Sequence, residues 1–148
     1  MTHHLTSCTA TIFAIFLLKS TVDTVEPSKL KITRLPNGPE LSSPVVVGTG
    51  QTLAIYCAAV NTDGPETVRG LHWRFPNNSS VPVVSGNQSQ YDVGMVRYLA
   101  NSYTWTGLLR MNRVQLSYAG IYKCVANISG MPKNRSMEIQ VSGGCPLK

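Results

Sequence analysis

Two cysteines with a tryptophan between them constrain this chain more than any other feature. Cys57 ends an alternating apolar run that begins at Leu53, and Cys124 lies in a second alternating run, two places after Tyr122. Trp73 stands between the two runs. Alternate residues of a strand point to the same face, so both cysteines are expected on the inward faces of two packed sheets. The chain is therefore predicted to be all-β, an antiparallel β-sandwich of two packed sheets.

The composition fits one small globular domain. Of the 148 residues, 43% are hydrophobic and 14% are charged, and 12 Gly and 9 Pro punctuate the chain. A disordered chain would carry fewer apolar residues and more charge. Once an N-terminal leader is set aside, the length leaves room for a single domain. We expect this domain over residues 27–142, followed by a flexible tail over residues 143–148.

The first residues have the pattern of a secretory signal peptide. Residues 11–18 are almost entirely apolar, and small and polar residues follow them. This stretch is too short to span a bilayer. We therefore expect residues 1–24 to be a signal peptide, removed from a secreted or extracellular protein. A buried strand or an uncleaved anchor is the alternative. No later stretch reaches the ~20 apolar residues of a membrane-spanning helix.

Short alternating segments separated by turn residues recur along the rest of the chain, without sustained helical periodicity. They predict about eight strands between Leu30 and Val141. Within residues 71–75, His72 is expected to point outward, between Leu71 and Trp73, which are expected to point inward. The nine candidate segments behind this approximate number are 30–35, 45–47, 51–58, 71–75, 81–84, 93–98, 105–114, 120–127 and 136–141.

The residues around the two cysteines resemble the immunoglobulin superfamily. Before its second cysteine the family carries Leu-x-Ile-x-x-Val-x-x-x-Asp-x-Gly-x-Tyr-x-Cys. Residues 109–124 read Leu-Arg-Met-Asn-Arg-Val-Gln-Leu-Ser-Tyr-Ala-Gly-Ile-Tyr-Lys-Cys. The first half of the pattern matches as well, with Gly-Gln-Thr-Leu-Ala-Ile-Tyr-Cys at residues 50–57 and Leu-His-Trp at residues 71–73. The resemblance covers nearly the whole mature chain.

This resemblance implies an immunoglobulin-like fold of the intermediate type (I-set) with variable-type features. It also implies a disulfide between Cys57 and Cys124, and a core framework of Trp73, Leu109 and Tyr122. The last predicted strand lacks the Phe-Gly-x-Gly bulge through which antigen-receptor variable domains pair. That departure favours the intermediate type and argues against an antigen receptor.

A second departure concerns Tyr118, which stands where the family usually has Asp. In the family this Asp resembles an ion-pair partner for an arginine. Arg97 lies twelve residues before Leu109, which is the position that the family's arginine occupies. We expect either that Tyr118 stacks under the Arg97 guanidinium or that Arg97 is solvated. An exposed cation–π contact of this kind is worth about 0.5–1 kcal/mol.

Five Asn-x-Ser triplets are candidate glycosylation sites in a secreted chain. They are Asn77, Asn78, Asn87, Asn127 and Asn134. Chance occurrence is the alternative, and adjacent Asn77 and Asn78 would rarely both be modified. We expect Asn127 on an outward strand face and Asn134 in the hairpin loop that follows. Sugars there would crowd one sheet, so we hypothesise that a partner binds the opposite sheet or the loop at residues 61–65.

Cys145 is left as an odd cysteine once the leader, with Cys8, is removed. It follows Gly143 and Gly144 in the predicted tail. An odd cysteine in a secreted chain indicates an interchain disulfide, which would give a covalent dimer or a tether to another subunit. A free thiol and a longer protein whose remainder is missing are the alternatives.

Neither charge nor polar residues indicate catalysis. The formal net charge is +6, but the basic residues are scattered without a dense run. An ordinary solvated surface is therefore expected rather than a focused field for acidic glycans, and no nucleic-acid-binding motif occurs. His72 is the only histidine after the leader, and no His or Cys pair has metal-ligand spacing. We expect no enzyme activity, no metal and no cofactor.

The sequence thus predicts an extracellular recognition module that binds a protein partner, as in cell adhesion, receptor or immune-type recognition. The alternative is a soluble secreted decoy or carrier that sequesters a ligand. Three aromatic residues near one predicted turn are candidate contact anchors, because large rings dominate interface energetics. They are Tyr98, Tyr103 and Trp105. For Trp105, ordinary packing is preferred, because large aromatic side chains are usually well buried.

Overall fold

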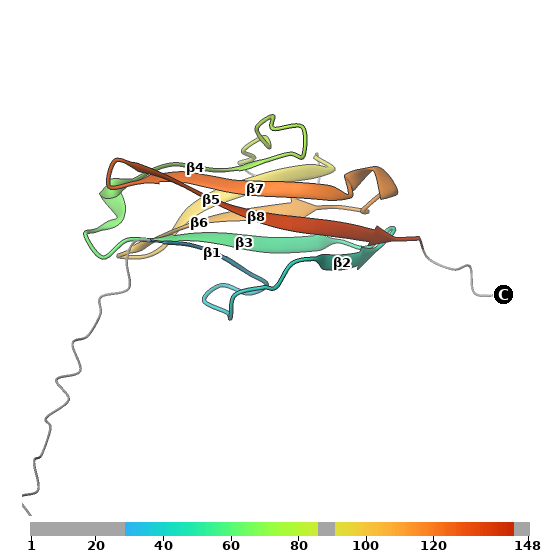
Figure 1. The fold of residues 1–148 in the computed structure, drawn as a ribbon, viewed down its shortest axis with the longest axis horizontal. Coiled ribbons are helices and arrows are strands. Elements are labelled where there is room, and N and C mark those ends of the chain that lie inside the picture. The colour runs from blue at the N-terminus through green and yellow to red at the C-terminus, as the bar shows by residue number, and fades with distance from the viewer. Residues whose placement is uncertain (1–28, 86–90, 144–148) are drawn as a thin grey trace, which may run out of the picture.

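A computed structural model describes residues 29–85 and 91–143, which form two packed β-sheets (Figure 1). The prediction of an all-β sandwich is confirmed. The predicted leader, Cys8, Asn87 and Cys145 lie outside the described residues. The described elements are β1 (Lys29–Thr33), β2 (Val45–Gly48), β3 (Leu53–Val60), η1 (Pro65–Thr67), β4 (Val68–Arg74), β5 (Val93–Asn101), β6 (Thr104–Met111), η3 (Leu116–Tyr118), β7 (Gly120–Ile128) and β8 (Met131–Ser142).

The strands are divided between two four-stranded sheets. One has the order β1-β3-β6-β5 and the other β2-β8-β7-β4. All neighbours in the first sheet are antiparallel. In the second sheet β2 runs parallel to β8, and the remaining pairs are antiparallel. The chain changes sheet at every connection except those from β5 to β6 and from β7 to β8, so residues far apart in sequence share one core.

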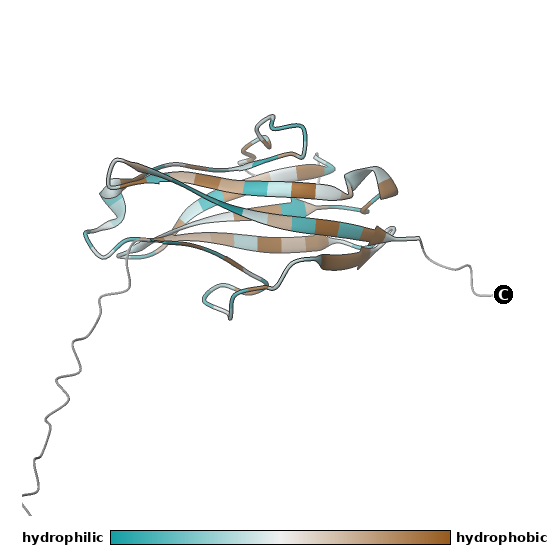
Figure 2. Ribbon diagram, viewed as in Figure 1, coloured by the Kyte–Doolittle hydropathy of each residue, from teal (hydrophilic) through white to brown (hydrophobic). Residues whose placement is uncertain are grey.

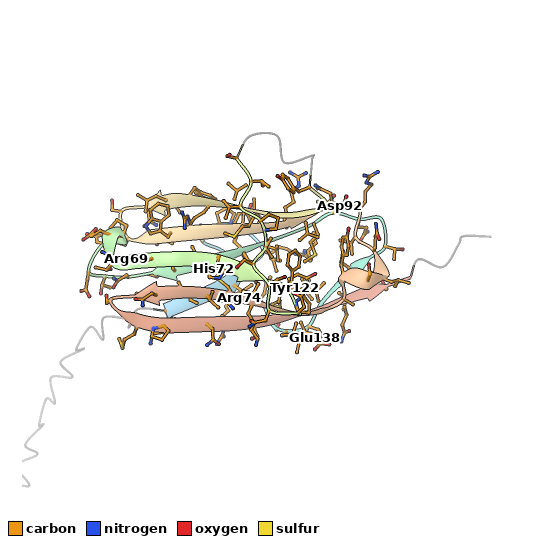
Figure 3. All side chains as sticks on the ribbon, turned by 90° about the horizontal axis from the view of Figure 1, so that it is seen from above. Arg69, His72, Arg74, Asp92, Tyr122 and Glu138 are labelled. Carbon is orange, nitrogen blue, oxygen red and sulfur yellow. A yellow bond between two sulfur atoms is a disulfide. The ribbon has the colours of Figure 1, made fainter. Side chains whose placement is uncertain are left out.

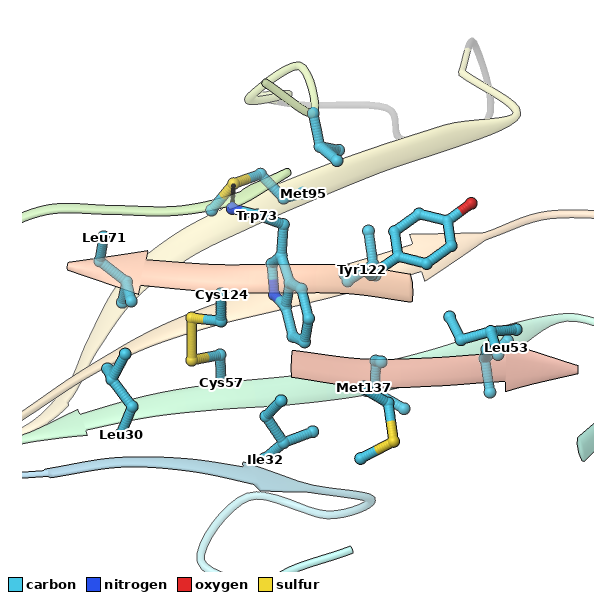
Figure 4. Close-up of a cluster of buried hydrophobic side chains, with 14 of the residues drawn as sticks. Leu30, Ile32, Leu53, Cys57, Leu71, Trp73, Met95, Tyr122, Cys124 and Met137 are labelled. Carbon is cyan, nitrogen blue, oxygen red and sulfur yellow. Dashed lines mark hydrogen bonds between the residues drawn. A yellow bond between two sulfur atoms is a disulfide. The ribbon is translucent and has the colours of Figure 1, made fainter. Parts of the chain in front are cut away.

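Strand β3 shows why the alternating pattern produces this core. Its residues alternate between buried and half-buried along the whole strand, beginning with buried Leu53. Cys57 falls on the buried side and forms a disulfide with Cys124 across a sequence separation of 67. Figure 4 shows this bond between the two layers with Trp73 beside it. Trp73 is fully buried, and its Nε1–H donates to the carbonyl of Gly107 at 2.9 Å.

The corner before β7 is closed by the side chain of Tyr122. Its hydroxyl donates to the carbonyl of Tyr118 at 3.0 Å, and its ring packs against Phe75 with ring centroids 6.1 Å apart. Burial, together with neighbouring Tyr118, raises the pKa of Tyr122 to about 12. This is the tyrosine corner that characterises sandwiches of this kind.

One predicted strand is absent. Residues 81–84 make only an isolated bridge, between Val83 and Met95. Pro82 has no N–H to donate, although its carbonyl accepts from the Met95 N–H at 2.9 Å. Buried Val81 and Val84 nevertheless face the interior, so this segment closes the open side of the sandwich between β4 and β5 without forming a full ladder.

The last strand is longer than predicted. Strand β8 begins at Met131, and Asn134 pairs with Val125 within it. The prediction that Asn134 lies in the hairpin loop is therefore wrong. The turn consists of Ser129 and Gly130, both with positive φ. Figure 2 shows that the first part of β8 is hydrophilic. This part runs past the core and has no alternating apolar residues, so the sequence pattern did not reveal it as a strand.

Candidate interaction surfaces

A bulge in β4 determines which of its side chains reach the outer face of the sheet. The register with β7 shifts between Arg69 and His72, and Gly70 has a φ of +64. The extra residue keeps Val68 and Leu71 buried while Arg69 is exposed and His72 is half-buried. Figure 3 shows Arg69, His72 and Arg74 following one another along the strand.

Two hydrogen bonds fix the position of His72. Its Nδ1 lies 2.5 Å from the carbonyl oxygen of Gly70, and its Nε2 lies 3.2 Å from Nε of Arg74. Since a carbonyl only accepts and a guanidinium only donates, Nδ1 carries the proton and Nε2 accepts. Arg74 also donates to the carbonyl of Asn78 at 3.4 Å. The predicted outward position of His72 is confirmed, but the ring serves to hold Arg74.

Beside this bulge lies a groove that crosses β4, β7 and β8, called here the basic groove. Its volume is about 420 Å³. Its lining residues include two arginines, one lysine and one histidine, and none is acidic. Lys133 lies opposite buried Ala126, so its side chain points to the inner side of the sheet, whereas Arg69 and Arg74 lie opposite outward residues of β7. The apolar part of the lining includes Val125 and Pro132. The groove is lined by Arg69, Gly70, His72, Arg74, Val125, Ala126, Asn127, Pro132, Lys133 and Asn134.

A second hollow adjoins the basic groove at Arg69 and Asn127. Its volume is about 510 Å³, and Glu66 and Ser129 are among the residues that line it. The buried side chain of Asn61 donates to Ser129 Oγ at 3.1 Å. The loop at residues 61–65 is thus next to the β7–β8 turn, so it is not a surface remote from Asn127.

The outer face of the sheet β1-β3-β6-β5 has a different character. Tyr56 lies opposite Leu108, which lies opposite Val96. In the next outward row Thr106 lies between Ala58 and Tyr98. This set of six residues, called here the tyrosine face, is buried or half-buried despite pointing away from the core.

The two tyrosines of this face influence each other. Burial raises the pKa of Tyr98, and neighbouring Tyr56 raises it further. An antiparallel sheet usually presents a polar face to water. Here the rows combine aliphatic side chains with two phenol rings, each of which has an apolar body and a polar tip. The face can therefore form both apolar contacts and hydrogen bonds.

The described glycosylation candidates all lie away from the tyrosine face. Asn77 and Asn78 are exposed in the turn after β4, Asn127 is exposed on β7, and Asn134 is exposed on β8. Asn127 and Asn134 both line the basic groove. A glycan on either of them would project over the sheet β2-β8-β7-β4. Their occupancy stays a prediction.

Arg97 has its cation–π contact with Trp105 rather than Tyr118, so the stacking alternative is wrong, while the exposure of Arg97 agrees with the solvated alternative. Its guanidinium carbon lies 5.9 Å from the ring centroid of Trp105. Burial raises the pKa of Tyr118, with Asp92 raising it further and Arg113 lowering it. Arg97 and Arg69 line the same hollow, whose volume is about 270 Å³. Figure 3 shows Asp92 at the opposite end of the sandwich from Arg69.

The aromatic residues proposed as contact anchors fall into different environments. Trp105 is half-buried against the core and donates from Nε1 to the carbonyl of Pro65 at 2.9 Å, which confirms the packing interpretation. Tyr103 is 55% exposed in the β5–β6 turn. Only Tyr98 belongs to the tyrosine face.

Across residues 29–85 and 91–143, no three His, Cys, Asp or Glu side chains gather in a way that could hold a metal ion. In the same part of the chain there is no helix of the length and apolarity needed to cross a membrane.

Comparison with known proteins relates this chain to others by its fold. No protein-family model matches the sequence, and no curated protein matches it. Among solved structures, Dpr2 Ig1-Ig2 in complex with DIP-Theta Ig1-Ig3 is similar with a TM-score of 0.53 and 16% identity, over 76% of this chain and 32% of that chain. The I-band fragment I67-I69 from titin is similar with a TM-score of 0.51 and 14% identity, over 77% of this chain and 33% of that chain. This chain therefore spans about a third of those multidomain chains, and its two sheets form an immunoglobulin-like fold.

Proposed function

We propose that this domain is an extracellular recognition module that binds a protein partner through the tyrosine face. The single observation that carries the proposal is the half-buried, largely apolar outer surface formed by Tyr56, Val96, Tyr98 and Leu108. Tyrosine is enriched among the residues that dominate binding energy, and such residues cluster at the centre of an interface. A sheet face of this composition is better suited to a protein surface than to bulk water.

The placement of the candidate glycosylation sites supports the same face. All four sites in the described residues lie on the other sheet or in the turn after β4. Glycans are bulky and solubilising, so they would shield that side and leave the tyrosine face accessible. The proposal thus retains the opposite-sheet part of the hypothesis drawn from the sequence.

An extracellular location is supported by the disulfide between Cys57 and Cys124, since such bonds persist in oxidising compartments. In the proposed protein, residues 1–24 are removed as a signal peptide, residues 27–142 form the recognition domain, and Cys145 in the tail links two copies. Dpr2, a structure with the same fold, was solved in complex with another protein, DIP-Theta. That complex supports the proposal, because both of its members consist of Ig domains.

The proposal is tested by a binding screen of the full-length secreted protein against an array of extracellular proteins. We expect a hit whose affinity falls more than about tenfold in the double variant Tyr56→Ser, Tyr98→Ser, as loss of hot-spot side chains does. The matched control, Val46→Ser with Ile121→Ser, removes two exposed apolar side chains from the other sheet and is expected to stay within about twofold. Equal affinity of the tyrosine variant and the wild type, with both folded by circular dichroism, contradicts the proposal.

A further inference from the structure

We infer that the basic groove is a second binding site, specific for an acidic peptide segment of a protein partner. In the bound state one apolar side chain of the peptide lies over Val125, and carboxylates on either side face Arg69, Arg74 and Lys123. This site lies on the opposite sheet from the tyrosine face, so it is independent of the proposed function.

The fold concentrates positive charge that is dispersed in the sequence. Arg69 and Arg74 come from β4, while Lys123 comes from β7. Lys123 is exposed on the same outer face, because it lies opposite Arg74 in the register of β4 and β7. Within the described residues, the side chains of Arg69 and Lys123 make no hydrogen bond or ion pair. Their charges are therefore available to a ligand.

Acidic groups do not neutralise this site. Glu66 is the nearest candidate, but it lines the adjoining hollow rather than the groove. Glu138 accepts a hydrogen bond from Gln140 and stands opposite Ile121, towards the other end of the sheet. Glu40 forms an ion pair with Arg135. A cleft with charges of one sign on its walls attracts ligands of the opposite sign.

The apolar floor distinguishes a peptide from a polysaccharide. Val125 is half-buried at the centre of the groove between β4 and β8, where it pairs with both His72 and Asn134. Pro132 is exposed beside it. A sulfated polysaccharide would use the cations but has no apolar side chain to cover these two residues. A peptide with an aliphatic residue between acids uses both parts of the groove.

The groove is also partly preorganised. Because His72 Nε2 accepts from Arg74 Nε, the guanidinium is held at the edge of the groove before any ligand arrives. Preorganised groups lose less conformational entropy on binding. Asn127 and Asn134 line the same groove, so a glycan on either one would close it. Access is thus expected to depend on which of these two asparagines is modified.

The test uses full-length protein carrying Asn127→Gln and Asn134→Gln, so that no glycan covers the groove. The probe is a fluorescent peptide, Asp-Glu-Leu-Glu-Asp, followed by polarisation. Three comparison probes are an uncharged version with Asn and Gln, a version with Gly in place of Leu, and a heparin hexasaccharide. We expect the acidic Leu peptide to bind best, and its affinity to fall as salt is added, because salt screens exposed charges.

Charge variants then locate the binding site. Arg69→Gln with Lys123→Gln is expected to weaken the acidic Leu peptide about tenfold, since each exposed ion pair changes affinity by up to about fivefold. Arg110→Gln with Arg113→Gln removes the same net charge elsewhere and is expected to change affinity by less than about twofold. Equal losses in both variants, no binding of the acidic Leu peptide, equal binding of the Gly version, or stronger binding of heparin would each overturn the inference. None of these outcomes bears on the tyrosine face.

Discussion

At the scale of single residues, Tyr122 combines burial with one hydrogen bond that holds the corner before β7. Substitution by Phe keeps the ring against Phe75 and removes only the hydroxyl that donates to Tyr118. We expect Tyr122→Phe to lower the free energy of unfolding by about 1 kcal/mol. Urea unfolding at neutral pH measures this loss. Tyr103→Phe is the control, because Tyr103 is 55% exposed and no hydrogen bond of its hydroxyl is found in the described residues.

The same residue produces a dependence on alkaline pH. The pKa of Tyr122 is raised from 10.0 to about 12, so the folded state holds this proton more tightly than the unfolded state. The stabilisation is complete below pH 10 and is lost as the pH rises towards 12. Wild-type stability should therefore fall more steeply than that of Tyr122→Phe over this interval. Parallel curves would contradict the raised pKa. Tyr98 and Tyr118, whose pKa values are also raised, leave a smaller fall in the variant.

How well a residue could be predicted depends on whether its role is local. The burial of Cys57, Trp73 and Tyr122 follows from strand alternation, which is visible in the sequence. The partner of Arg97 depends on the register between β5 and β6, which places Leu99 opposite Trp105, and no sequence pattern states that register. Asn61 lies in a loop, as predicted, but its complete burial could not be predicted, because it depends on side-chain hydrogen bonds to the Gly64 carbonyl and to Ser129.

At the scale of elements, the bulge in β4 was missed because a bulge interrupts the alternation by which strands are recognised. The sequence does contain one signal, since an isolated Gly in a strand often marks a bulge. Gly70 is such a residue, and without the extra position Arg69 and His72 would point to opposite faces. The basic groove could not be predicted from the sequence either. Its cations come from β4 and β7, which are distant in sequence and are brought together only by their pairing in the sheet.

Substitution of Gly70 tests this account of β4. A Cβ at this position would meet nothing within 4 Å, but the φ of +64 is strained for an L side chain. We expect Gly70→Ala to cost about 1 kcal/mol of stability, and Gly70→Asn to cost less, because Asn tolerates this conformation. Gly143→Ala, where a Cβ also has open space, is the control. If thermal unfolding shows Gly70→Ala to be neutral, the bulge does not depend on glycine.

At the scale of the whole molecule, two sheets share one core and present outer faces of opposite character. The tyrosine face is apolar and free of described glycosylation candidates, while the basic groove is charged and flanked by two of them. The division follows from topology, because β3, β5 and β6 belong to one sheet and β4, β7 and β8 to the other. A ligand on one face therefore leaves the other face accessible.

Both faces depend on the disulfide that joins the sheets. Closing a loop across a sequence separation of 67 restricts the unfolded chain by roughly 4 kcal/mol in the chain-entropy model. A small domain has only about 5–15 kcal/mol of stability in total. We therefore expect Cys57→Ala with Cys124→Ala to lose about 4 kcal/mol in urea unfolding, and reduction of the wild type by dithiothreitol to cause a similar loss. Cys145→Ser is the control, since it leaves the buried pair intact and should change stability by less than about 0.5 kcal/mol. If the double variant matches the wild type, the packing of the two sheets alone is sufficient to hold the domain together, and the bond between them is not its main constraint.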